Sequence, residues 1–381
     1  MPLSRLHPLT SLRFFAALLV FFHHLFLLRS SPAYSGFYHR FLEEGYIGVT
    51  FFFVLSGFIL AYRYHAQFHS LTWSGLKKFY QARLARIYPV HFLAIFLGVP
   101  FVTATLLNEP LQSLKALAAN LTLTHGFVQS TAIRSAFNSP SWSLSVEAFL
   151  YLLLPAIVCV FLRFSRRQSL VRLAALMLAL YAAYLAAVLV FRNIPDSWWW
   201  LYFFPLTRLA DFTLGALAAL IFLRWNPNTS SKLSRRHATY VEIGGVAILT
   251  GQYAFAPLVH QSLRFSVYYL PVLILLLLIF AFQRGRLSAW LSHPELIFLG
   301  EISFSFYMVH RLVLKYFSQV YFAGSPVAAA LTAFAVTAFI SMIIYHYYET
   351  PLRRYLRSLS WSRRPAPARS LNPLPQTERS V

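Results

Sequence analysis

The sequence contains little cysteine and few acidic residues: one cysteine, Cys159, and 11 Asp and Glu among 381 residues. A single cysteine excludes a disulfide within the chain, a zinc site built from several thiolates and an iron–sulfur cluster. The sequence also lacks a Walker loop, a dinucleotide-binding loop and any repeat with a period of 20–50 residues. We therefore expect no bound metal, and we interpret Cys159 as a small core residue.

Charged residues are also scarce, at 12% of the chain, whereas hydrophobic residues make up 58% and aromatic residues 18%. This composition leaves too little polar surface to cover a soluble globule. Apolar stretches long enough to cross a bilayer occupy residues 12–28, 46–62, 87–107, 143–162, 173–191, 201–223, 241–259, 265–282, 296–317 and 327–346. The sequence therefore predicts an all-α polytopic membrane protein, a bundle of about ten transmembrane helices. Residues 114–126 are shorter and are expected to be interfacial or re-entrant.

The excess of Lys and Arg gives a formal net charge of +22, which on its own would suggest a nucleic-acid partner. Their distribution gives another explanation. With the N-terminus in the cytoplasm, the inner segments hold about four times as many Lys and Arg residues as the outer loops, which is the positive-inside rule. We therefore expect no nucleic-acid partner and two cytoplasmic termini. Residues 1–352 are predicted to form one transmembrane domain, and residues 353–381 a disordered, Pro- and Arg-rich cytoplasmic tail.

Two ionisable residues, Arg13 and His24, lie eleven positions apart in the first apolar stretch. Eleven residues turn a helix through about three revolutions, so both side chains are expected on one face, about 16 Å apart along the axis. An ionisable group within a membrane span costs about 2.5–3.5 kcal/mol, which favours a functional use for both. The alternative is that Arg13 extends to the inner headgroups and His24 bonds to a neighbouring helix.

A second pair, Arg83 and Arg86, shares a helix face where the third span is predicted to enter from the cytoplasm. Two guanidinium groups in this position are better suited to bind the phosphates of a cytoplasmic ligand than to bind a single carboxylate. The alternative is that they only anchor the helix end at the inner membrane surface.

An acidic residue, Glu147, is predicted about one turn inside the outer end of the fourth span. Ser143 and Tyr151 flank it at i−4 and i+4 on the same helix face, an arrangement that suits proton transfer. Because His24 also falls in the outer half of its helix, we expect Glu147 to meet His24 and to orient its imidazole. The alternative is a lone buried acid that stays protonated.

Two further acidic residues are expected to have a structural role. Arg208 and Asp211 lie at i, i+3 in the sixth span, so we interpret them as a neutralising ion pair. Glu349 ends the last span near Arg353 and Arg354, and there we expect a mostly solvated carboxylate.

A last polar stripe places Ser303, Tyr307 and His310 at i, i+4 and i+7 on one helix face. This spacing is compatible with a site residue, but Tyr and His are also common anchors at the membrane interface. Together, the clusters predict a polar path from an inner Arg pair to an outer His and Glu.

The segments RFFAALLVFFHH, GVTFFFVLSGFIL, RLARIYP, SWSLSVEAFLY, RLADFTLGAL, ISFSFYMVH and YYETP occur in this order over residues 9–351. In these segments the chain resembles the acyltransferase-3 family of integral membrane O-acyltransferases. The resemblance implies no permanently bound cofactor and cytoplasmic acyl-CoA as donor of an acyl group, by default acetyl. It implies as acceptor a hydroxyl of a cell-surface polysaccharide, lipopolysaccharide or lipid-linked glycan precursor, and it implies a location in the bacterial inner membrane.

The motifs of this family fall on three residue pairs, Arg13 with His24, Arg83 with Arg86, and Ser143 with Glu147. By the resemblance, His24 is the catalytic histidine and the second pair is associated with the donor. Some members of the family carry an additional serine-hydrolase-like domain. This chain ends in a short tail instead, so we expect it to act alone or with a separate envelope biosynthesis partner.

The resulting hypothesis is that His24 is the general base toward the acceptor hydroxyl and that Glu147 orients it. Arg83 and Arg86 would hold the donor phosphates, and Arg13 the pantetheine arm or the developing oxyanion. A covalent acyl-His24 intermediate is the variant mechanism.

Two other classes of protein remain as alternatives. A proton-coupled secondary transporter would also use buried ionisable residues, although the sequence shows no internal repeat. A non-catalytic membrane partner of envelope enzymes would leave the ionisable residues without a use.

Overall fold

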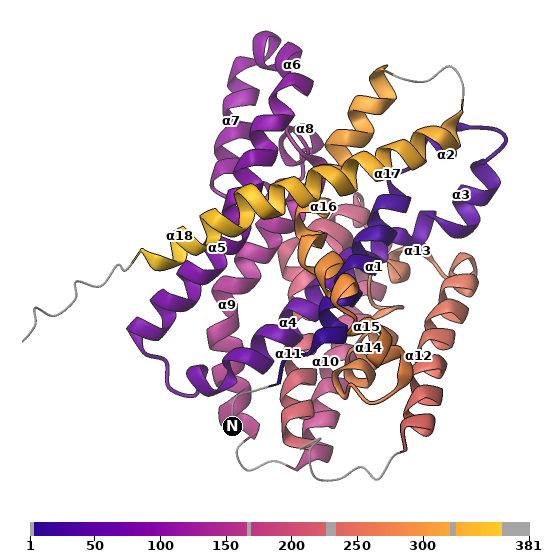
Figure 1. Cartoon of the computed structure of the whole chain (residues 1–381). Helices are drawn as coiled ribbons and strands as arrows, with labels where there is room; N and C mark the ends of the chain where they lie inside the picture. The colour runs from indigo at the N-terminus through magenta and orange to yellow at the C-terminus, as the bar shows by residue number, and fades with distance from the viewer. Residues whose placement is uncertain (1–3, 166–168, 226–233, 321–324, 360–381) are drawn as a thin grey trace, which may run out of the picture.

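The computed structural model describes residues 4–165, 169–225, 234–320 and 325–359 (Figure 1). Within these ranges the regular structure is entirely helical. The helices at the ten predicted spans are α1 (His7–His23), α4 (Ile47–Phe68), α5 (Trp73–Gly98), α9 (Trp142–Ser165), α10 (Leu170–Phe191), α11 (Pro205–Trp225), α12 (Arg235–Phe255), α14 (Leu270–Ala281), α16 (Pro294–Val320) and α17 (Pro326–Ile343). Short helices connect them: α2 (Phe26–Ser30), α3 (Ser35–Phe41), α6 (Thr103–Asn108), α7 (Pro110–Leu121), α8 (Thr131–Arg134), α13 (Gln261–Arg264), α15 (Arg286–Leu291) and α18 (Thr350–Ser358).

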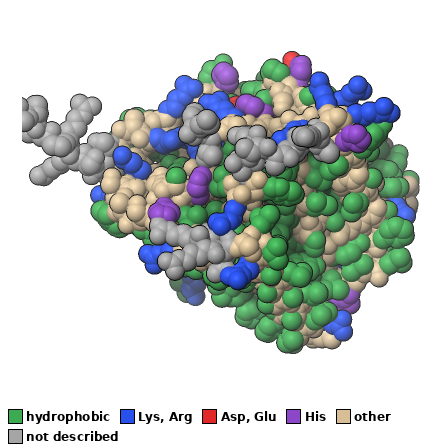
Figure 2. Space-filling view, turned by 90° about the horizontal axis from the view of Figure 1, so that it is seen from below, with side chains coloured by type: hydrophobic (Ala, Val, Ile, Leu, Met, Phe, Trp, Pro, Cys, Tyr) green, Lys and Arg blue, Asp and Glu red, His purple; other side chains and the backbone are tan. Residues whose placement is uncertain are grey.

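The all-α polytopic membrane fold is confirmed. In the described ranges, eight helical segments are long and apolar enough to cross a membrane. The two other predicted spans, 241–259 and 265–282, fall on α12 and on the shorter apolar α14. The count of about ten and the cytoplasmic placement of both termini stay predictions. Figure 2 shows the molecule from below, where hydrophobic side chains form a large area, Lys and Arg side chains lie mostly around it, and few acidic side chains are seen.

Side-chain caps define where several helices begin. Each cap is a Ser or Thr whose hydroxyl accepts a hydrogen bond from the backbone N–H three residues later, which satisfies one of the free donors of the first turn. The capping residues are Thr72 before α5, Ser169 before α10, Ser234 before α12 and Ser325 before α17. Because of its cap, α5 begins at Trp73 rather than near residue 87, and Arg83 and Arg86 lie within the helix.

The segment predicted not to span, residues 114–126, overlaps the second half of α7, which is twelve residues long. At 1.5 Å per residue this helix is too short to cross a bilayer. At the other end of the chain, α18 continues to Ser358 and packs on α5, where the Gln81 side-chain amide donates to the carbonyl oxygen of Leu356 at 2.7 Å. The tail predicted from residue 353 is therefore helical at its beginning, and residues 360–381 lie outside the described residues.

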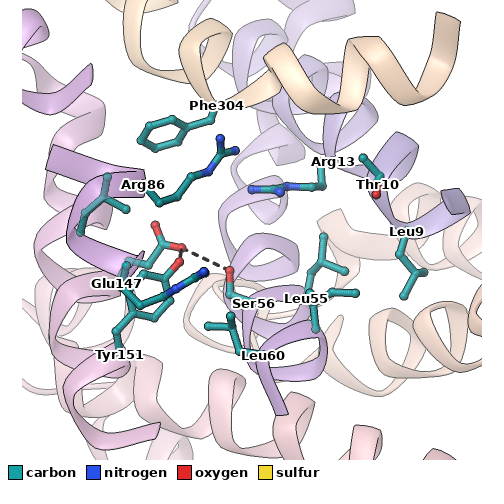
Figure 3. Close-up of a pocket in the computed structure, with 13 residues that line it drawn as sticks. Leu9, Thr10, Arg13, Leu55, Ser56, Leu60, Arg86, Glu147, Tyr151 and Phe304 are labelled. Atoms are coloured by element: carbon teal, nitrogen blue, oxygen red, sulfur yellow. Dashed lines mark hydrogen bonds between the residues drawn. The ribbon is translucent and has the colours of Figure 1, made fainter. Parts of the chain in front are cut away.

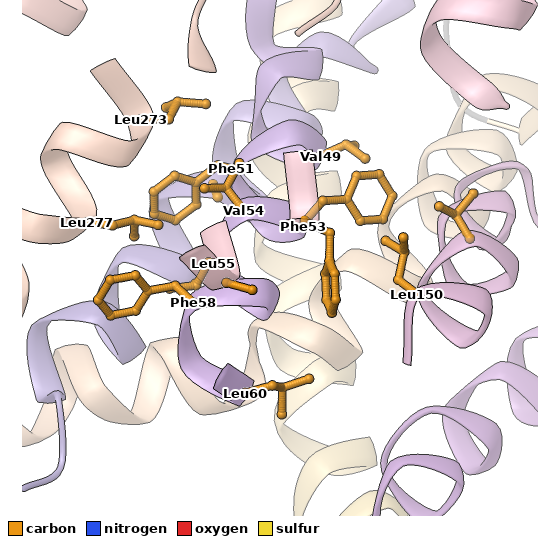
Figure 4. Packing of buried hydrophobic residues seen from close by; sticks show 14 of the residues in the cluster. Val49, Phe51, Phe53, Val54, Leu55, Phe58, Leu60, Leu150, Leu273 and Leu277 are labelled. Carbon is orange, nitrogen blue, oxygen red and sulfur yellow. The ribbon is translucent and has the colours of Figure 1, made fainter. Parts of the chain in front are cut away.

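The core is centred on α4, whose buried side chains pack against α9, α11 and α14 (Figure 4). Helices α4 and α11 approach closely because each places a glycine at the crossing. A Cβ atom on Gly57 would lie 2.0 Å from the carbonyl oxygen of Phe212, and one on Gly215 would lie 2.1 Å from that of Val54. Small residues allow such contact between membrane helices, where packing rather than hydrophobic burial holds helices together.

We expect Gly57→Ala to destabilise the protein by about 1–3 kcal/mol, because the new methyl group would force α4 and α11 apart. The matched control is Gly244→Ala on α12, where a Cβ atom would meet nothing within 4 Å. The midpoint of thermal unfolding of the detergent-solubilised protein measures the stability of both variants. Equal midpoints for the two variants would contradict the close crossing.

Candidate active site

A cavity of about 110 Å³ lies between α1, α4, α5, α9 and α16 (Figure 3). Its polar lining comes from Thr10 and Arg13 on α1, Ser56 on α4, Arg83 and Arg86 on α5, and Glu147 and Tyr151 on α9. In Figure 3 the guanidinium groups of Arg13 and Arg86 point toward one another beside Glu147. The structure therefore brings together residues from three of the predicted clusters.

Two of the three guanidinium groups in this cavity lack an acidic partner. In the described part of the chain, no carboxylate lies within ion-pairing distance of Arg13 or Arg83. Arg83 instead lies over aromatic rings, including that of Tyr151 at 5.7 Å, and its buried Nε has no hydrogen-bond partner. Buried cations without counter-charges are costly in a membrane protein, so this cavity suits an anionic ligand.

The third guanidinium group, that of Arg86, forms an ion pair with Glu349. The Glu349 carboxylate is fully buried, accepts a hydrogen bond from the Ser305 hydroxyl at 2.7 Å and lies 3.4 Å from Arg353. The expectation of a mostly solvated Glu349 is therefore wrong. A π-helical turn over Ile344–Glu349 precedes α18 and places the carboxylate against α5 and α16.

The Glu147 carboxylate accepts hydrogen bonds from the hydroxyl groups of Tyr151 and, at 3.3 Å, of Ser56. The predicted link along α9 between Glu147 and Tyr151 is present. The predicted contact with His24 is wrong, since no hydrogen bond joins these two side chains among the described residues. A helix is about 10–12 Å across, so a similar membrane depth did not ensure that the two groups face each other.

A smaller cavity of about 40 Å³ adjoins the first and shares with it Arg13, Ser56, Glu147 and Phe304. It extends to Ser143 on α9 and Tyr307 on α16. These two hydroxyl groups are 2.9 Å apart, and Tyr307 donates to the carbonyl oxygen of Pro140 at 3.1 Å. The two cavities thus lead from Arg83 and Arg86 to Tyr307.

One turn beyond Tyr307, His310 contacts His24. The Nε2 of His310 lies 3.2 Å from the Nδ1 of His24, and the two ring centroids are 5.0 Å apart. The Nδ1 of His310 lies 2.5 Å from the carbonyl oxygen of Tyr307, and the Nδ1 of His24 lies 2.8 Å from that of Val20. The orienting position that we predicted for Glu147 is therefore occupied by His310.

These contacts define the protonation pattern of the two neutral imidazoles. A carbonyl oxygen only accepts, so both Nδ1 atoms carry hydrogen. The single Nδ1–H of His24 then faces two acceptors, the carbonyl oxygen of Val20 and the Nε2 of His310, and His24 keeps a lone pair on its own Nε2. No hydrogen bond occupies this atom in the described structure, and His24 is only partly buried. The free Nε2 is suited to accept a proton from a ligand.

His24 caps the C-terminal end of α1 instead of lying within a continuous helix. The buried hydroxyl of Tyr38 holds this end by donating to the carbonyl oxygen of His23 at 2.5 Å. Burial raises the pKa of Tyr38 to about 12, so this hydroxyl stays a donor at neutral pH.

The predicted ion pair between Arg208 and Asp211 is confirmed. The guanidinium nitrogen lies 2.8 Å from the carboxylate oxygen, and both side chains are fully buried. Arg208 also donates to the carbonyl oxygen of Tyr202 at 2.6 Å, and Asp211 accepts from Ser266. This pair does not line either cavity described above.

The sequence analysis missed Ser56 and Ser305 as partners of the buried carboxylates. Ser56 is a single hydroxyl in the run FFFVLSGFIL, which is the only signal that could have indicated it. Ser305 lies on the opposite side of its helix from the stripe that we singled out. A second missed group joins Glu44 to Arg264, with the hydroxyl of Tyr269 donating to Glu44 at 2.8 Å.

The fold and this site define a polytopic helical membrane protein with ionisable groups along an internal path. The chain belongs to a family of acyltransferases, since the family model described as acyltransferase domain matches residues 7–346. It is therefore a membrane acyltransferase, and these findings do not favour the transporter alternative.

Curated relatives agree with this assignment. The acyltransferase MdmB of Streptomyces mycarofaciens is 28% identical over 387 residues, which cover 92% of each chain. The O-acetyltransferase OatA of Staphylococcus aureus is 26% identical over 83% of this chain and 54% of its own length. The peptidoglycan O-acetyltransferase OatA of Listeria monocytogenes is 24% identical over 82% of this chain and 52% of its own. The chain thus spans about half the length of the OatA proteins. No solved structure matches it.

Proposed function

We propose that the protein transfers an acyl group, by default acetyl, from cytoplasmic acyl-CoA to a hydroxyl group of an envelope glycan or its lipid-linked precursor. The proposed location is the bacterial inner membrane. The observation that carries the proposal is the pair of unpaired guanidinium groups, Arg13 and Arg83, in a cavity that leads toward the His24–His310 pair. The acetyltransferase relatives support the choice of acetyl.

In the proposed reaction the donor phosphates bind near Arg83 and Arg86, and Arg13 supports the pantetheine arm or the thioester oxygen. The free Nε2 of His24 accepts the proton of the acceptor hydroxyl. The hydroxyl oxygen forms a C–O bond with the acyl carbon, the C–S bond breaks, and the CoA thiolate recovers the proton from the imidazolium. His310 holds the imidazole in the required tautomer.

The free Nε2 of His24 also suits a two-step variant. In the first step the Nε2 of His24 would form a C–N bond with the thioester carbonyl carbon, the C–S bond would break, and the departing CoA thiolate would take up the Nδ1 proton of the acyl-imidazolium. In the second step the acceptor hydroxyl would form a C–O bond with the acyl carbon, the C–N bond would break, and the released imidazole would take up the hydroxyl proton. Intact-mass measurement after addition of acetyl-CoA without acceptor distinguishes the variants, because only the second gives a protein heavier by one acetyl group.

The proposal is tested with purified protein in proteoliposomes, supplied with acetyl-CoA and an envelope glycan fraction. Thiol release that requires the glycan, together with base-labile acetyl groups on it, is the expected result. Arg83→Gln should raise the KM for acetyl-CoA about tenfold or more, since charge-assisted hydrogen bonds contribute about 1.5–3 kcal/mol. Arg236→Gln, at an exposed cation on α12, is the control. Thiol release that is absent or independent of glycan would overturn the proposal.

A further inference from the structure

The residue after His310, Arg311, is a cation at the His24 end of the path. It lies seven residues beyond Phe304, which lines both cavities, so it is about 10 Å farther along α16. Its guanidinium carbon lies 4.9 Å from the ring centroid of Phe26. The Phe26 ring in turn lies 5.7 Å from the imidazole of His24. Phe26 thus bridges the Arg311 guanidinium and the His24 ring.

No acidic side chain compensates this cation. Across the described ranges, no carboxylate lies within ion-pairing distance of Arg311, although the side chain is partly buried. Its aromatic neighbour is the ring of Phe26, which separates it from the imidazole of His24. A half-buried guanidinium with only an aromatic neighbour leaves most of its five donors available to a ligand.

A second cation on the same helix face makes this position more electropositive. Lys315 lies four residues after Arg311, is also partly buried, and has its ammonium group 4.8 Å from the ring centroid of Phe101. Its charge adds to the positive potential that an anion would meet at this end of α16.

We propose that Arg311 forms a subsite that binds a phosphate group of the acceptor while the acceptor hydroxyl lies at Nε2 of His24. The proposal rests on the proposed function, which places the acceptor at His24. The donor has its own cations on the other side of the site, Arg83 and Arg86 for its phosphates and Arg13 for its pantetheine arm or thioester oxygen. Arg311 is therefore left for the acceptor, and its planar fork suits two phosphate oxygens at once.

The test compares two acceptors that share the reactive hydroxyl, a neutral oligosaccharide and the same oligosaccharide bearing one phosphate monoester, with the protein in a non-ionic detergent. For the wild type we expect a higher kcat/KM with the phosphorylated acceptor. Arg311→Gln should lower that value at least about tenfold by raising the acceptor KM, and should change the value for the neutral acceptor less than about threefold. For the phosphorylated acceptor, the kcat/KM of Arg311→Lys should fall between those of the wild type and Arg311→Gln, because lysine keeps the charge and lacks the planar guanidinium group.

Arg29→Gln is the control, since Arg29 is an exposed cation on nearby α2. Equal losses for both acceptors in Arg311→Gln would overturn the subsite and leave Arg311 with a role in positioning His24. An effect of Arg311→Gln that depends on added phosphatidylglycerol, rather than on the acceptor phosphate, would overturn the acceptor assignment in favour of a lipid headgroup. A wild type that acylates neither acceptor would instead refute the proposed function.

Discussion

Replacing His24 by Ala is expected to lower the rate of acyl transfer by about 10²–10⁴-fold, the usual contribution of a general base. The loss follows from the free Nε2 of His24. The two imidazoles in contact with His24 are otherwise engaged, since the Nδ1 of His23 lies 2.6 Å from the carbonyl oxygen of Glu43 and the Nε2 of His310 lies 3.2 Å from the Nδ1 of His24. Glycan-dependent thiol release from acetyl-CoA in proteoliposomes measures the rate. Expression and membrane insertion should be unchanged, because the variant removes an ionisable group from a membrane helix.

His39→Ala, at an exposed histidine on α3, is the matched control and should retain the wild-type rate. His310→Phe provides a second comparison, since it removes one of the two acceptors of the His24 Nδ1–H, leaves the carbonyl oxygen of Val20 and keeps an aromatic ring. We expect it to reduce kcat less than His24→Ala does. Normal turnover by His24→Ala at equal expression would remove His24 from the mechanism.

Asp211→Ala is expected to destabilise the fold by about 3–5 kcal/mol, because it leaves the fully buried guanidinium of Arg208 without a counter-charge. The hydrogen bond from Arg208 to the carbonyl oxygen of Tyr202 remains, but it does not neutralise the charge. The quantity to measure is the unfolding midpoint of the detergent-solubilised protein. Glu109→Ala, at an exposed carboxylate before α7, should unfold like the wild type.

The double variant Arg208→Met, Asp211→Leu separates the charge effect from a packing effect. Removing both charges and filling the space with apolar side chains should recover much of the lost stability, since buried ion pairs are often replaceable by hydrophobic residues. A double variant as unstable as Asp211→Ala would show that packing rather than the unpaired charge causes the loss.

Sequence patterns predicted contacts that are local along a helix. The ion pair between Arg208 and Asp211 depends only on the rise and twist of one helix, and it was correctly inferred. The apolar stretches likewise predicted the membrane helices, although the lysines and arginines of α5 hid its beginning. These features need no knowledge of how helices are arranged around one another.

Contacts between distant segments could not be predicted in the same way. Glu349 and Arg86 are 263 residues apart, and His310 and His24 are 286 residues apart. The sequence indicated at which depth each group lies, but not which neighbour it faces. The expected partner of His24 was therefore wrong, although His24 and His310 had both been singled out as candidates.

The π-helical turn over Ile344–Glu349 is the place where this segment can best accept a change in length. Such a turn corresponds to one residue more than an α-helix would contain over the same rise. Deleting one residue of this turn before Glu349 would therefore restore α-helical spacing and leave Glu349 and α18 in nearly the same orientation. Deleting one residue in the regular part of α17 would instead rotate all that follows by about 100°. The Glu349 carboxylate would then leave Arg86, and α18 would present another face to α5.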